Sequence, residues 1–458
     1  MTIKRGTLAA YAAPCLPIAA VGLPVVVYLP PYYAATLGLD LAMVGLVFAM
    51  VRFVDVPLDP LIGHFLDRTE TRFGRFRPWI VGGTAIMMIG LYMVFMAAPG
   101  ISPAGAFAGL VVMYVGYSTC AVVHTSWGSA LSDDYDQRSR VFGWWQAANL
   151  LGLFLILAVP PLALWMAGST DPAIGVHAMG WTIILTLPLA VAWAVSVLPD
   201  RARRGGDHHR LRDIITVIKV KLLRRLLLID LLASLAPGMA GALLLFFFTA
   251  ARGYPPAQAS TLLLFYFLAG MLAAPAWVVV AKRHGKHRTV ILALTVYALC
   301  HAGTLFLPRG NFLLAAFGLG LAGIPAVAPA FLLRAMLADV SDAETLASGR
   351  ERTGLFFAAL VVAQKLGYAI PVGVSFTVLK LIGFDAALGS ANSTESITSL
   401  SLLFVIPPVI FSLLAAALLR GWPIDAAAQA RNAAALAARH LDEAQGSGVA
   451  AAMATDAV

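Results

Sequence analysis

The chain has 458 residues, of which 60% are hydrophobic and 12% charged, and its mean hydropathy is +0.84. Soluble globular proteins carry about 25% Asp, Glu, Lys and Arg, so this composition excludes a water-soluble protein. Uncharged stretches such as 6–39 and 172–199 exceed the roughly 20 residues with which a helix crosses a bilayer. The sequence therefore predicts an all-α integral membrane protein that crosses the bilayer many times.

Charged clusters divide the chain into twelve segments of membrane-spanning length. The predicted spans are 7–36, 41–66, 78–98, 104–131, 141–167, 176–198, 226–251, 256–281, 289–307, 312–337, 353–379 and 399–419. A basic segment at 199–225 separates six spans from six. We therefore expect an N-terminal bundle over 1–198, a linker over 199–225, a C-terminal bundle over 226–420 and an Ala-rich tail over 421–458.

The positions of Lys and Arg predict the orientation in the membrane. They concentrate before the first span, in every second loop, in the linker and in the tail, while the other loops hold few of them. Cytoplasmic loops are rich in Lys and Arg, which predicts cytoplasmic termini in a plasma (inner) membrane. The net charge of +9 is then a topology signal rather than a nucleic-acid site. The apolar spacing of stretch 211–223 suggests a short helix at the cytoplasmic surface, but a solvated or headgroup-bound connector is the preferred interpretation.

The two halves repeat a motif at the end of a span. Leu131-Ser-Asp133-Asp-Tyr-Asp136 and Leu337-Ala-Asp339-Val-Ser-Asp342 share their acidic positions, and each is followed by two Arg residues. Two parallel six-helix repeats around a central cavity describe a secondary transporter, in which one half moves against the other. A duplicated scaffold without transport activity is the alternative.

These loop motifs have two interpretations. Acidic and basic groups at helix ends can form ion pairs that close the cytoplasmic side in one state, or they can simply cap helices. The predicted gate residues are Asp67, Arg68, Arg75, Asp133, Asp136, Arg138, Asp339, Asp342, Arg350 and Arg352.

A few charged residues fall inside the predicted spans. Asp230 and Arg334 lie five residues from charged loop ends and are expected to reach the interface. The other four, Arg52, Asp55, Asp59 and Lys365, lie in mid-span. A charge at the bilayer centre costs about 2.5 to 3.5 kcal/mol even on insertion scales, so these side chains should face the bundle interior or a wet cavity.

Arg52, Asp55 and Asp59 lie on one stripe of the second helix because their spacing is i, i+3 and i+7. Two carboxylates one turn apart repel each other unless a cation or a proton lies between them. Na⁺ and H⁺ both fit. A static network in which Arg52 neutralises one Asp is the alternative, but one Arg cannot balance two acids.

Two stretches resemble the signatures of a known transporter family. One is residues 51–79, with Asp55, Asp59 and the loop Asp67-Arg-Thr-Glu-Thr-Arg-Phe-Gly-Arg-Phe-Arg-Pro-Trp79. The other runs from Met336 to Ala369 and includes Lys365. The chain is thereby similar to the glycoside-pentoside-hexuronide:cation symporters of the major facilitator superfamily. The resemblance implies that fold and a coupling cation bound by Asp55 and Asp59.

The resemblance also implies further site residues. A polar residue of the fourth helix near Thr119 or Cys120 would assist the cation, Lys365 would couple the cation and solute sites, and Trp127 would line the solute site. Sugar-binding members have Asp in the first and fourth helices, which this chain lacks, and the Arg expected early in the fifth helix is Trp145.

The remaining candidates describe an aromatic pocket with cationic groups. They are Tyr114, Tyr117, His124, Trp127, Trp144, Trp145, Gln146 and Asn149, with Lys365 opposite. This set favours an anionic or amphiphilic solute over a neutral hexoside. Aromatic residues of membrane helices also serve as packing residues, and His124 fits a hydrogen-bonded structural histidine equally well.

The sequence thus predicts a symporter, functional as a monomer, that couples Na⁺ or H⁺ to an organic solute such as a glycoside-like or anionic sugar derivative. No other cofactor is expected. A lysolipid carrier on the same fold and a receptor that binds without transport are the alternatives. A multi-pass membrane enzyme is a further one, but no His or Cys pair has ligand spacing within a span.

Overall fold

A computed structural model describes residues 3–131, 135–200, 219–349, 352–432, 434–436 and 438. Within these ranges, twelve helical segments are long and apolar enough to cross a membrane, and the secondary structure is helical without any strand. This confirms the predicted all-α fold with twelve membrane-spanning helices.

The first span is broken, and the next five are continuous. It comprises α1 (Arg5–Ala12), α2 (Cys15–Leu23), the π-helical turn η1 (Pro24–Tyr28) and α3 (Leu29–Ala35). Breaks occur at Pro14 and Pro24, because proline lacks the N–H and crowds the preceding turn. The other spans of this half are α4 (Leu41–Asp67), α5 (Arg77–Phe95), α6 (Pro103–Ala130), α7 (Tyr135–Ala167) and α8 (Pro172–Val197).

The second half repeats this arrangement. Its spans are α10 (Lys221–Phe246) continued by the π-turn η2 (Phe247–Ala251), α11 (Pro256–His284), and α12 (Lys286–Gly303) with the 3₁₀ turn η3 (Thr304–Phe306). They are followed by α13 (Phe312–Ser348), α14 (Thr353–Leu381), the short turn η4 (Gly389–Ala391) and α15 (Thr394–Leu418).

Several helices extend beyond the predicted spans. The predicted segment 312–337 continues to Ser348, because membrane thickness limits the apolar stretch and not the helix, which ends at Gly349 with a left-handed φ of 71°. Helix α15 begins at Thr394 instead of 399, since the Ser393 hydroxyl accepts a hydrogen bond from the Ser396 amide. Most of the predicted surface helix 211–223 lies outside the described residues, and its last residues begin α10.

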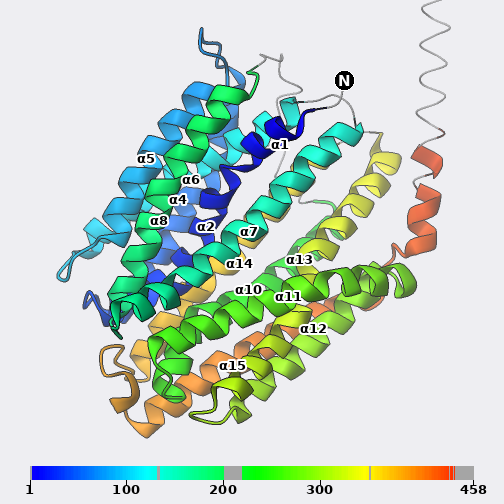
Figure 1. Cartoon of the computed structure of the whole chain (residues 1–458). Coiled ribbons are helices and arrows are strands. Elements are labelled where there is room, and N and C mark those ends of the chain that lie inside the picture. Colours follow the sequence, from blue (N-terminus) through cyan, green and yellow to red (C-terminus); the bar gives the residue numbers. More distant parts are fainter. Residues whose placement is uncertain are drawn as a thin grey trace, which may run out of the picture.

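The two halves meet along a few helices (Figure 1). Helix α4 packs on α14 and α7 packs on α11, while η1 and α3, the outer part of the first span, contact α10. Helices α1 and α2 pack instead on α7 and α8 of their own half. The two groups of helices meet at the lower left of Figure 1 and separate toward its upper right, on the side where α1 begins.

Small residues bring α4 and α14 into close contact. A Cβ atom on Gly45 would lie 2.9 Å from the Gly373 carbonyl oxygen, and one on Gly373 would lie 3.0 Å from the Ala49 Cβ. Membrane helices approach this closely where small residues face each other, because lipid supplies no hydrophobic force to press larger side chains together. This close approach of Gly45 and Ala49 to Gly373 sets the position of α4 relative to α14 where the halves meet.

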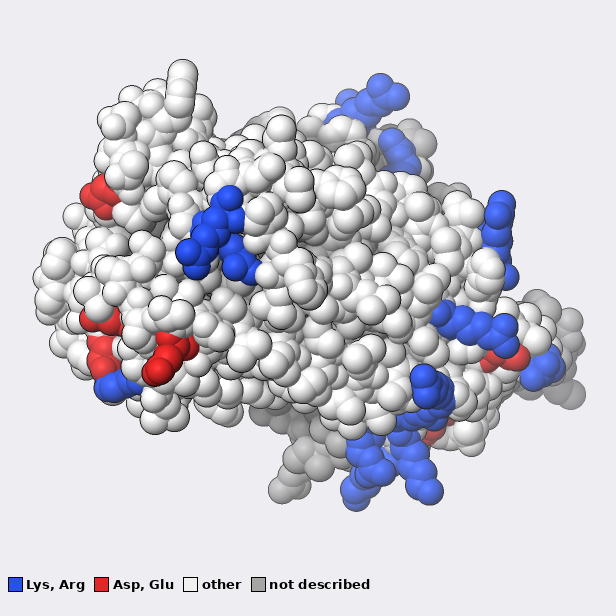
Figure 2. All heavy atoms as spheres, turned by 90° about the horizontal axis from the view of Figure 1, so that it is seen from below, with Lys and Arg blue, Asp and Glu red and all other residues white. Residues whose placement is uncertain are grey.

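The outer surface is apolar, as a lipid-facing surface requires. Large side chains such as Trp165, Phe306 and Leu313 are 78%, 86% and 79% exposed. On the side seen in Figure 2, charged side chains gather toward the two ends of the molecule and leave a broad uncharged region between them. The exposed apolar residues therefore replace a soluble protein's polar surface.

The beginning of α5 is held by the end of the first half. The Asp200 carboxylate accepts hydrogen bonds from the backbone amides of Arg75, Phe76 and Arg77 at 3.0, 2.9 and 3.0 Å. Gly74 precedes them with φ 103°, and a Cβ atom on it would lie 2.1 Å from Asp200 Oδ2. Glycine is thus required both for the backbone conformation and for the close approach.

The second half contains the counterpart of this turn. Gly285, with φ 85°, precedes Lys286 and the start of α12, as Gly74 precedes Arg75 before α5. Glycines in the same backbone region at equivalent places support the internal repeat that the loop motifs predict.

We expect Asp200→Ala to lower the free energy of unfolding by about 2 kcal/mol, because three helix N-terminal amides lose a charged acceptor. Thermal unfolding of the purified protein in detergent measures this loss. Asp171→Ala, which removes the single-amide cap of α8, is the matched control and should cost less. Equal stability of Asp200→Ala and the wild type would contradict this role.

Candidate functional site

Four charges from two helices form one cluster between the halves. The Lys365 ammonium of α14 lies 3.1 Å from Asp55 Oδ1 and 2.8 Å from Asp59 Oδ2 of α4. Arg52 Nη1 lies 3.3 Å from Asp55 Oδ2. The structure therefore brings together the four mid-span charges of the sequence. Lys365 supplies the second positive charge, which Arg52 alone cannot provide for two carboxylates.

The side chains of the cluster differ in their exposure to water. Asp55 is fully buried, whereas the Asp59 side chain is 30% exposed and that of Lys365 16%. The Arg52 guanidinium lies 4.5 Å from the centre of the Tyr114 ring, an arrangement that stabilises the cation against a π-face. Two cations and two anions balance, so the cluster is neutral and each charge depends on the others.

A hydroxyl group completes the surroundings of Asp55. Ser118 of α6 donates a hydrogen bond to Asp55 Oδ1 at 2.9 Å. Thr119 instead bonds to the Val115 carbonyl, and the Cys120 sulfur lies 3.7 Å from the Thr84 hydroxyl of α5. Of the polar residues in this part of the fourth span, the structure thus places Ser118, next to the expected Thr119 and Cys120, against Asp55. The signal was available, since Ser118 lies four residues after Tyr114 and so shares its helix face.

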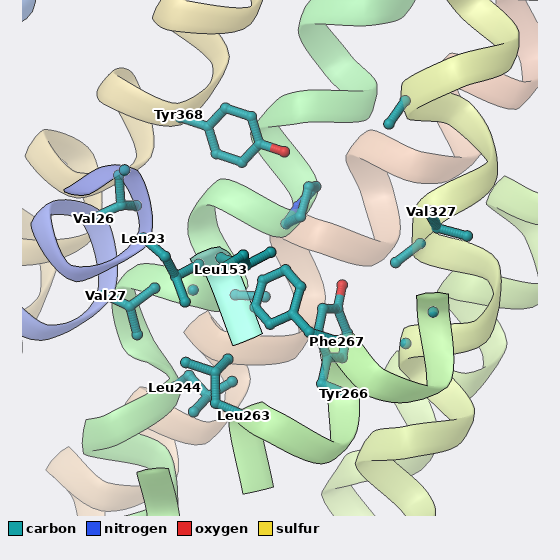
Figure 3. A pocket seen from close by; sticks show the side chains of 18 of the residues that line it. Leu23, Val26, Val27, Leu153, Leu244, Leu263, Tyr266, Phe267, Val327 and Tyr368 are labelled. Atoms are coloured by element: carbon teal, nitrogen blue, oxygen red, sulfur yellow. The ribbon is translucent and has the colours of Figure 1, made fainter. Parts of the chain in front are cut away.

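A cavity of about 580 Å³ lies beside the cluster, between the halves. Its volume falls within the range of small-molecule sites. Figure 3 shows aliphatic side chains of both halves, including Val26, Leu153 and Leu244, in this lining together with Phe267 and the hydroxyl-bearing Tyr266 and Tyr368. The polar groups of the lining are Arg52, Tyr114, Tyr117, Tyr266, Tyr297, His301, Gln364, Lys365 and Tyr368.

No acidic side chain among the described residues lines this cavity. The two carboxylates of the cluster lie behind Lys365, and α7 contributes Leu150, Leu153 and Phe154. The cavity is therefore a mostly apolar chamber with cationic, hydroxyl and amide groups. Lys365, Tyr117 and Tyr114 of the predicted pocket belong to it.

His124 has a structural role instead. Its ring stacks on Tyr11 with centroids 4.5 Å apart, Nε2 lies 2.7 Å from the Tyr11 carbonyl oxygen, and Nδ1 lies 3.7 Å from the Cys15 sulfur. Both ring nitrogens therefore bind the first span to α6. In this structure His124 therefore lies outside the cavity lining, in the hydrogen-bonded structural position that the sequence offered as the alternative.

Trp127 is also a packing residue in this conformation. It is fully buried, stacks on Phe76, and donates a hydrogen bond from Nε1 to the Pro199 carbonyl at 2.9 Å. It ties α6 to the start of α5 and to the end of the half. Trp127 is therefore not part of the cavity lining in this structure, and its polar atom is satisfied elsewhere.

The aromatic group at the start of α7 also lies apart from the cavity. Trp145 packs beside Ala12 and Cys15, and the Asn149 side chain donates to the Trp145 carbonyl. Trp144 and Gln146 are exposed. The face of α7 that lines the cavity begins at Leu150, so the predicted residues belong to the right helix but to an earlier turn.

The gate residues are only partly described. Asp133 and Arg350 lie outside the described residues, as do the side chains of Asp67, Asp136 and Arg138. Asp339 accepts both of its 2.7 Å hydrogen bonds from Lys286. This pair joins α12 and α13 within one half, so it supports the repeat but not the expected bond between halves.

The other gate residues are placed as follows. Arg75 is buried and donates from Nε to the Leu66 carbonyl at 2.9 Å, Arg68 is the exposed C-cap of α4, and Arg352 is the N-cap of α14. Asp342 lies partly exposed on α13. For Arg68, Arg352 and Asp342, no ion pair across the halves is found among the described contacts.

An ion pair that the sequence did not predict joins the halves at the opposite end. Lys380, near the end of α14, donates a hydrogen bond to Asp40, which caps α4 through the amides of Ala42 and Met43. The Lys380 hydrogen bond lowers the pKa of Asp40 below its ordinary value, and the two backbone amides add to this effect. By the predicted topology, this pair closes the external end.

We expect Lys380→Ala to separate the external ends of the halves. A lowered pKa means that the pair is intact at neutral pH and is lost as pH falls through that value, below the ordinary pKa of Asp. Distances between spin labels at exposed Thr170 and Ser390, measured by pulsed electron resonance in a cysteine-free background, should lengthen in the variant and in the wild type at acid pH. Lys282→Ala, at the other end, should leave them unchanged. Identical distances in Lys380→Ala and the wild type would refute the closure.

Comparisons with known proteins identify the family to which the chain is similar. Residues 10–426 match the family model described as MFS/sugar transport protein. The uncharacterized symporter YnaJ of Bacillus subtilis is 31% identical over 163 residues, 34% of either chain. A lactose permease of Lactobacillus delbrueckii is 24% identical over 370 residues, 76% of this chain and 57% of the permease. The matches thus span less than two thirds of the length of these two relatives.

Other similarities cover more of the chain. The putative glycoside/cation symporter YagG of Escherichia coli is 24% identical over 390 residues, 83% of either chain. A variant of the nucleoside transporter NupG has a TM-score of 0.70 at 14% identity, over 90% of this chain and all of that one, which establishes a shared fold. The family model covers nearly all of the membrane-spanning region, and the protein belongs to the MFS/sugar transport protein family.

Proposed function

We propose that the protein is a secondary active transporter that couples Na⁺ or H⁺ to the symport of an organic solute. The observation that carries this proposal is the neutral cluster of Asp55, Asp59, Lys365 and Arg52 between the halves, beside a cavity of about 580 Å³. The names of the relatives, which include a lactose permease and a putative glycoside/cation symporter, support it.

Asp55 and Asp59 form the cation site of this proposal. Their carboxylates face one point at which Lys365 Nζ now lies, 3.1 and 2.8 Å from one oxygen of each. Na⁺ prefers hard oxygen ligands, and the Ser118 hydroxyl beside Asp55 adds a third group. A proton taken up by either carboxylate would neutralise the same charge. The ammonium therefore stands where the coupling cation would bind.

Coupling follows from this competition. A cation that binds both carboxylates displaces Lys365, which then carries an unbalanced positive charge next to the cavity. A buried charge without a partner is costly, so the displaced ammonium favours a solute with an anionic or strongly polar group. Solute and cation thereby bind better together than alone, which is the condition for symport.

The solute class follows from the lining. The polar groups of the lining include tyrosine hydroxyls, the Gln364 amide and two cations, while the remaining surface is aliphatic and aromatic. We propose a glycoside-like or anionic sugar derivative with an apolar portion. Because the aliphatic lining also suits a lysolipid, a thermal-shift screen of lactose, raffinose, an aryl glucuronide and a lysophosphatidylcholine, each with and without Na⁺, separates the two classes.

The proposed setting is a plasma (inner) membrane with cytoplasmic termini and a monomer as the functional unit. The Asp40 and Lys380 pair then holds the external side closed, and the cavity opens toward the cytoplasm in this conformation. One monovalent cation that moves down about 100 mV releases about 2.3 kcal/mol, enough for roughly 50-fold accumulation of a solute at one-to-one coupling.

We expect Asp55→Asn and Asp59→Asn each to abolish cation binding. In the wild type, Na⁺ should raise the melting temperature above that in equal concentrations of K⁺, because a ligand that binds only the folded state stabilises it. Both variants should lose this difference, while Asp171→Asn, at an exposed helix cap, should keep it. If Na⁺ has no effect on the wild type, uptake of the screened solute with a pH gradient in proteoliposomes tests the proton instead. Accumulation that survives in both variants under either gradient would refute the site.

Lys365→Ala should make stability depend on Na⁺. Without the ammonium, two carboxylates repel each other in a buried site, which costs about 3 kcal/mol or more, and Na⁺ can replace the missing charge. We expect a lowered melting temperature in K⁺, a larger Na⁺ shift than in the wild type and loss of solute accumulation. Lys282→Ala serves as the control for a removed positive charge. An unchanged Na⁺ response together with unchanged uptake would exclude Lys365 from coupling.

A further inference from the structure

A fifth charged group lies within the membrane-spanning part of the second half and has no role in the cluster. Asp230 is the only acidic residue of α10 and is 2% exposed. It lies nine residues after the start of the helix, a rise of about 14 Å. The sequence predicts that Asp230 reaches the interface, but the structure buries it.

The hydrogen bonds of Asp230 are incomplete. Gln364 of α14 donates from Nε2 to Oδ1 at 3.3 Å, and no described residue donates to Oδ2. The nearby Arg334 of α13 donates instead to the Ala330 carbonyl at 2.7 Å and to Gln364 Oε1 at 2.8 Å. The Gln364 amide therefore stands between the acid and the guanidinium, and its orientation is fixed by both.

This geometry fits a neutral Asp230 better than an ionised one. A buried carboxylate without a cationic partner is so costly that proteins normally neutralise it. An ionised Asp230 would attract the guanidinium directly, since charge-assisted pairs are the stronger hydrogen bonds. Arg334 instead bonds to an amide and a carbonyl, as expected beside an uncharged acid.

The other groups around Asp230 supply no competing charge. Helix α14 presents Gln364 and Tyr368, and α13 presents Arg334. Helix α15, which also packs on α10, has Glu395 at its far end as its only charged residue. Lys365 is occupied by Asp55 and Asp59. Two groups can therefore neutralise Asp230: a proton bound to its own carboxyl, or the Arg334 guanidinium.

Gln364 connects this group to the transport cavity. It precedes Lys365 in the chain, and both it and Tyr368 line the cavity. A change in the hydrogen bonds of Gln364 therefore alters the cavity wall next to the charge cluster.

We propose that Asp230 is a proton-binding site of the second half, which holds a proton on Oδ2 in this conformation and pairs with Arg334 when the proton leaves. In the release step, the O–H bond of the carboxyl breaks, the proton passes to water, and the guanidinium moves from Gln364 Oε1 to the carboxylate. Gln364 Oε1 then loses its Arg334 donor and becomes available to hydroxyl groups in the cavity, while Gln364 Nε2 keeps its hydrogen bond to Asp230.

Infrared spectroscopy of the purified protein tests this proposal without any solute. A protonated carboxyl has a C=O stretching band that carboxylates lack, and difference spectra between neutral and alkaline pH report its loss. We expect the wild type to show this band, Asp230→Asn to lack it, and Asp171→Asn to retain it. Asp230→Glu should retain a shifted band, and size-exclusion profiles confirm that each variant is folded.

Two further variants assign the band and its partner. The double variant Asp55→Asn with Asp59→Asn should keep the band, since the proton belongs to Asp230 and not to the cluster. In Arg334→Gln the band should disappear at a pH about one unit or more higher than in the wild type. The reason is that the ionised Asp230 carboxylate loses its counter-charge. A band that persists in folded Asp230→Asn, or that disappears in the double variant, would overturn the proposal, as would an unchanged titration in Arg334→Gln.

Discussion

The interaction on which the structure depends is the attachment of Lys365 to two carboxylates of the other half. These two ion pairs join α14 to α4 in a partly buried site, and their partners cannot separate without leaving the fully buried Asp55 with less neutralising charge. Any movement of the halves that separates these helices therefore requires a substitute for one of the charges. In the proposed symport, a cation at the carboxylates and a solute at the ammonium would be such substitutes, and the cost of separating these charges would link binding to movement.

Contacts elsewhere in the molecule fix the positions of the helices that carry this cluster. Gly45, Ala49 and Gly373 allow α4 and α14 to touch, and the Asp40 and Lys380 pair fastens their ends. Asp200 and Gly74 anchor the start of α5, and His124 and Trp127 tie α6 to its neighbours. Helix α6 in turn presents Ser118 and Tyr114 to the cluster. Groups that resemble ligands in the sequence thus serve as supports, because their hydrogen bonds are already used within one half.

The differences between prediction and structure have a common cause. The stripe formed by Arg52, Asp55 and Asp59 could be predicted because helical periodicity is local. The choice of Ser118 over Thr119 depends on the rotation of α6 against α4, and the burial of Asp230 on the packing of α13 and α14 around α10. The position of the Trp127 ring depends on its hydrogen bond to the Pro199 carbonyl, which lies far away in the chain. None of these relations is encoded in the spacing along one helix.

The sequence by itself determined the membrane environment, the twelve spans, the internal repeat and the identity of the mid-membrane charges, because hydropathy and the cost of buried charge act residue by residue. Only the tertiary structure decided which charges neutralise each other, which aromatic residues face the cavity and which merely pack, and at which end the halves are joined. These depend on the relative rotation and crossing of helices that are far apart in the chain, which a one-dimensional pattern does not contain.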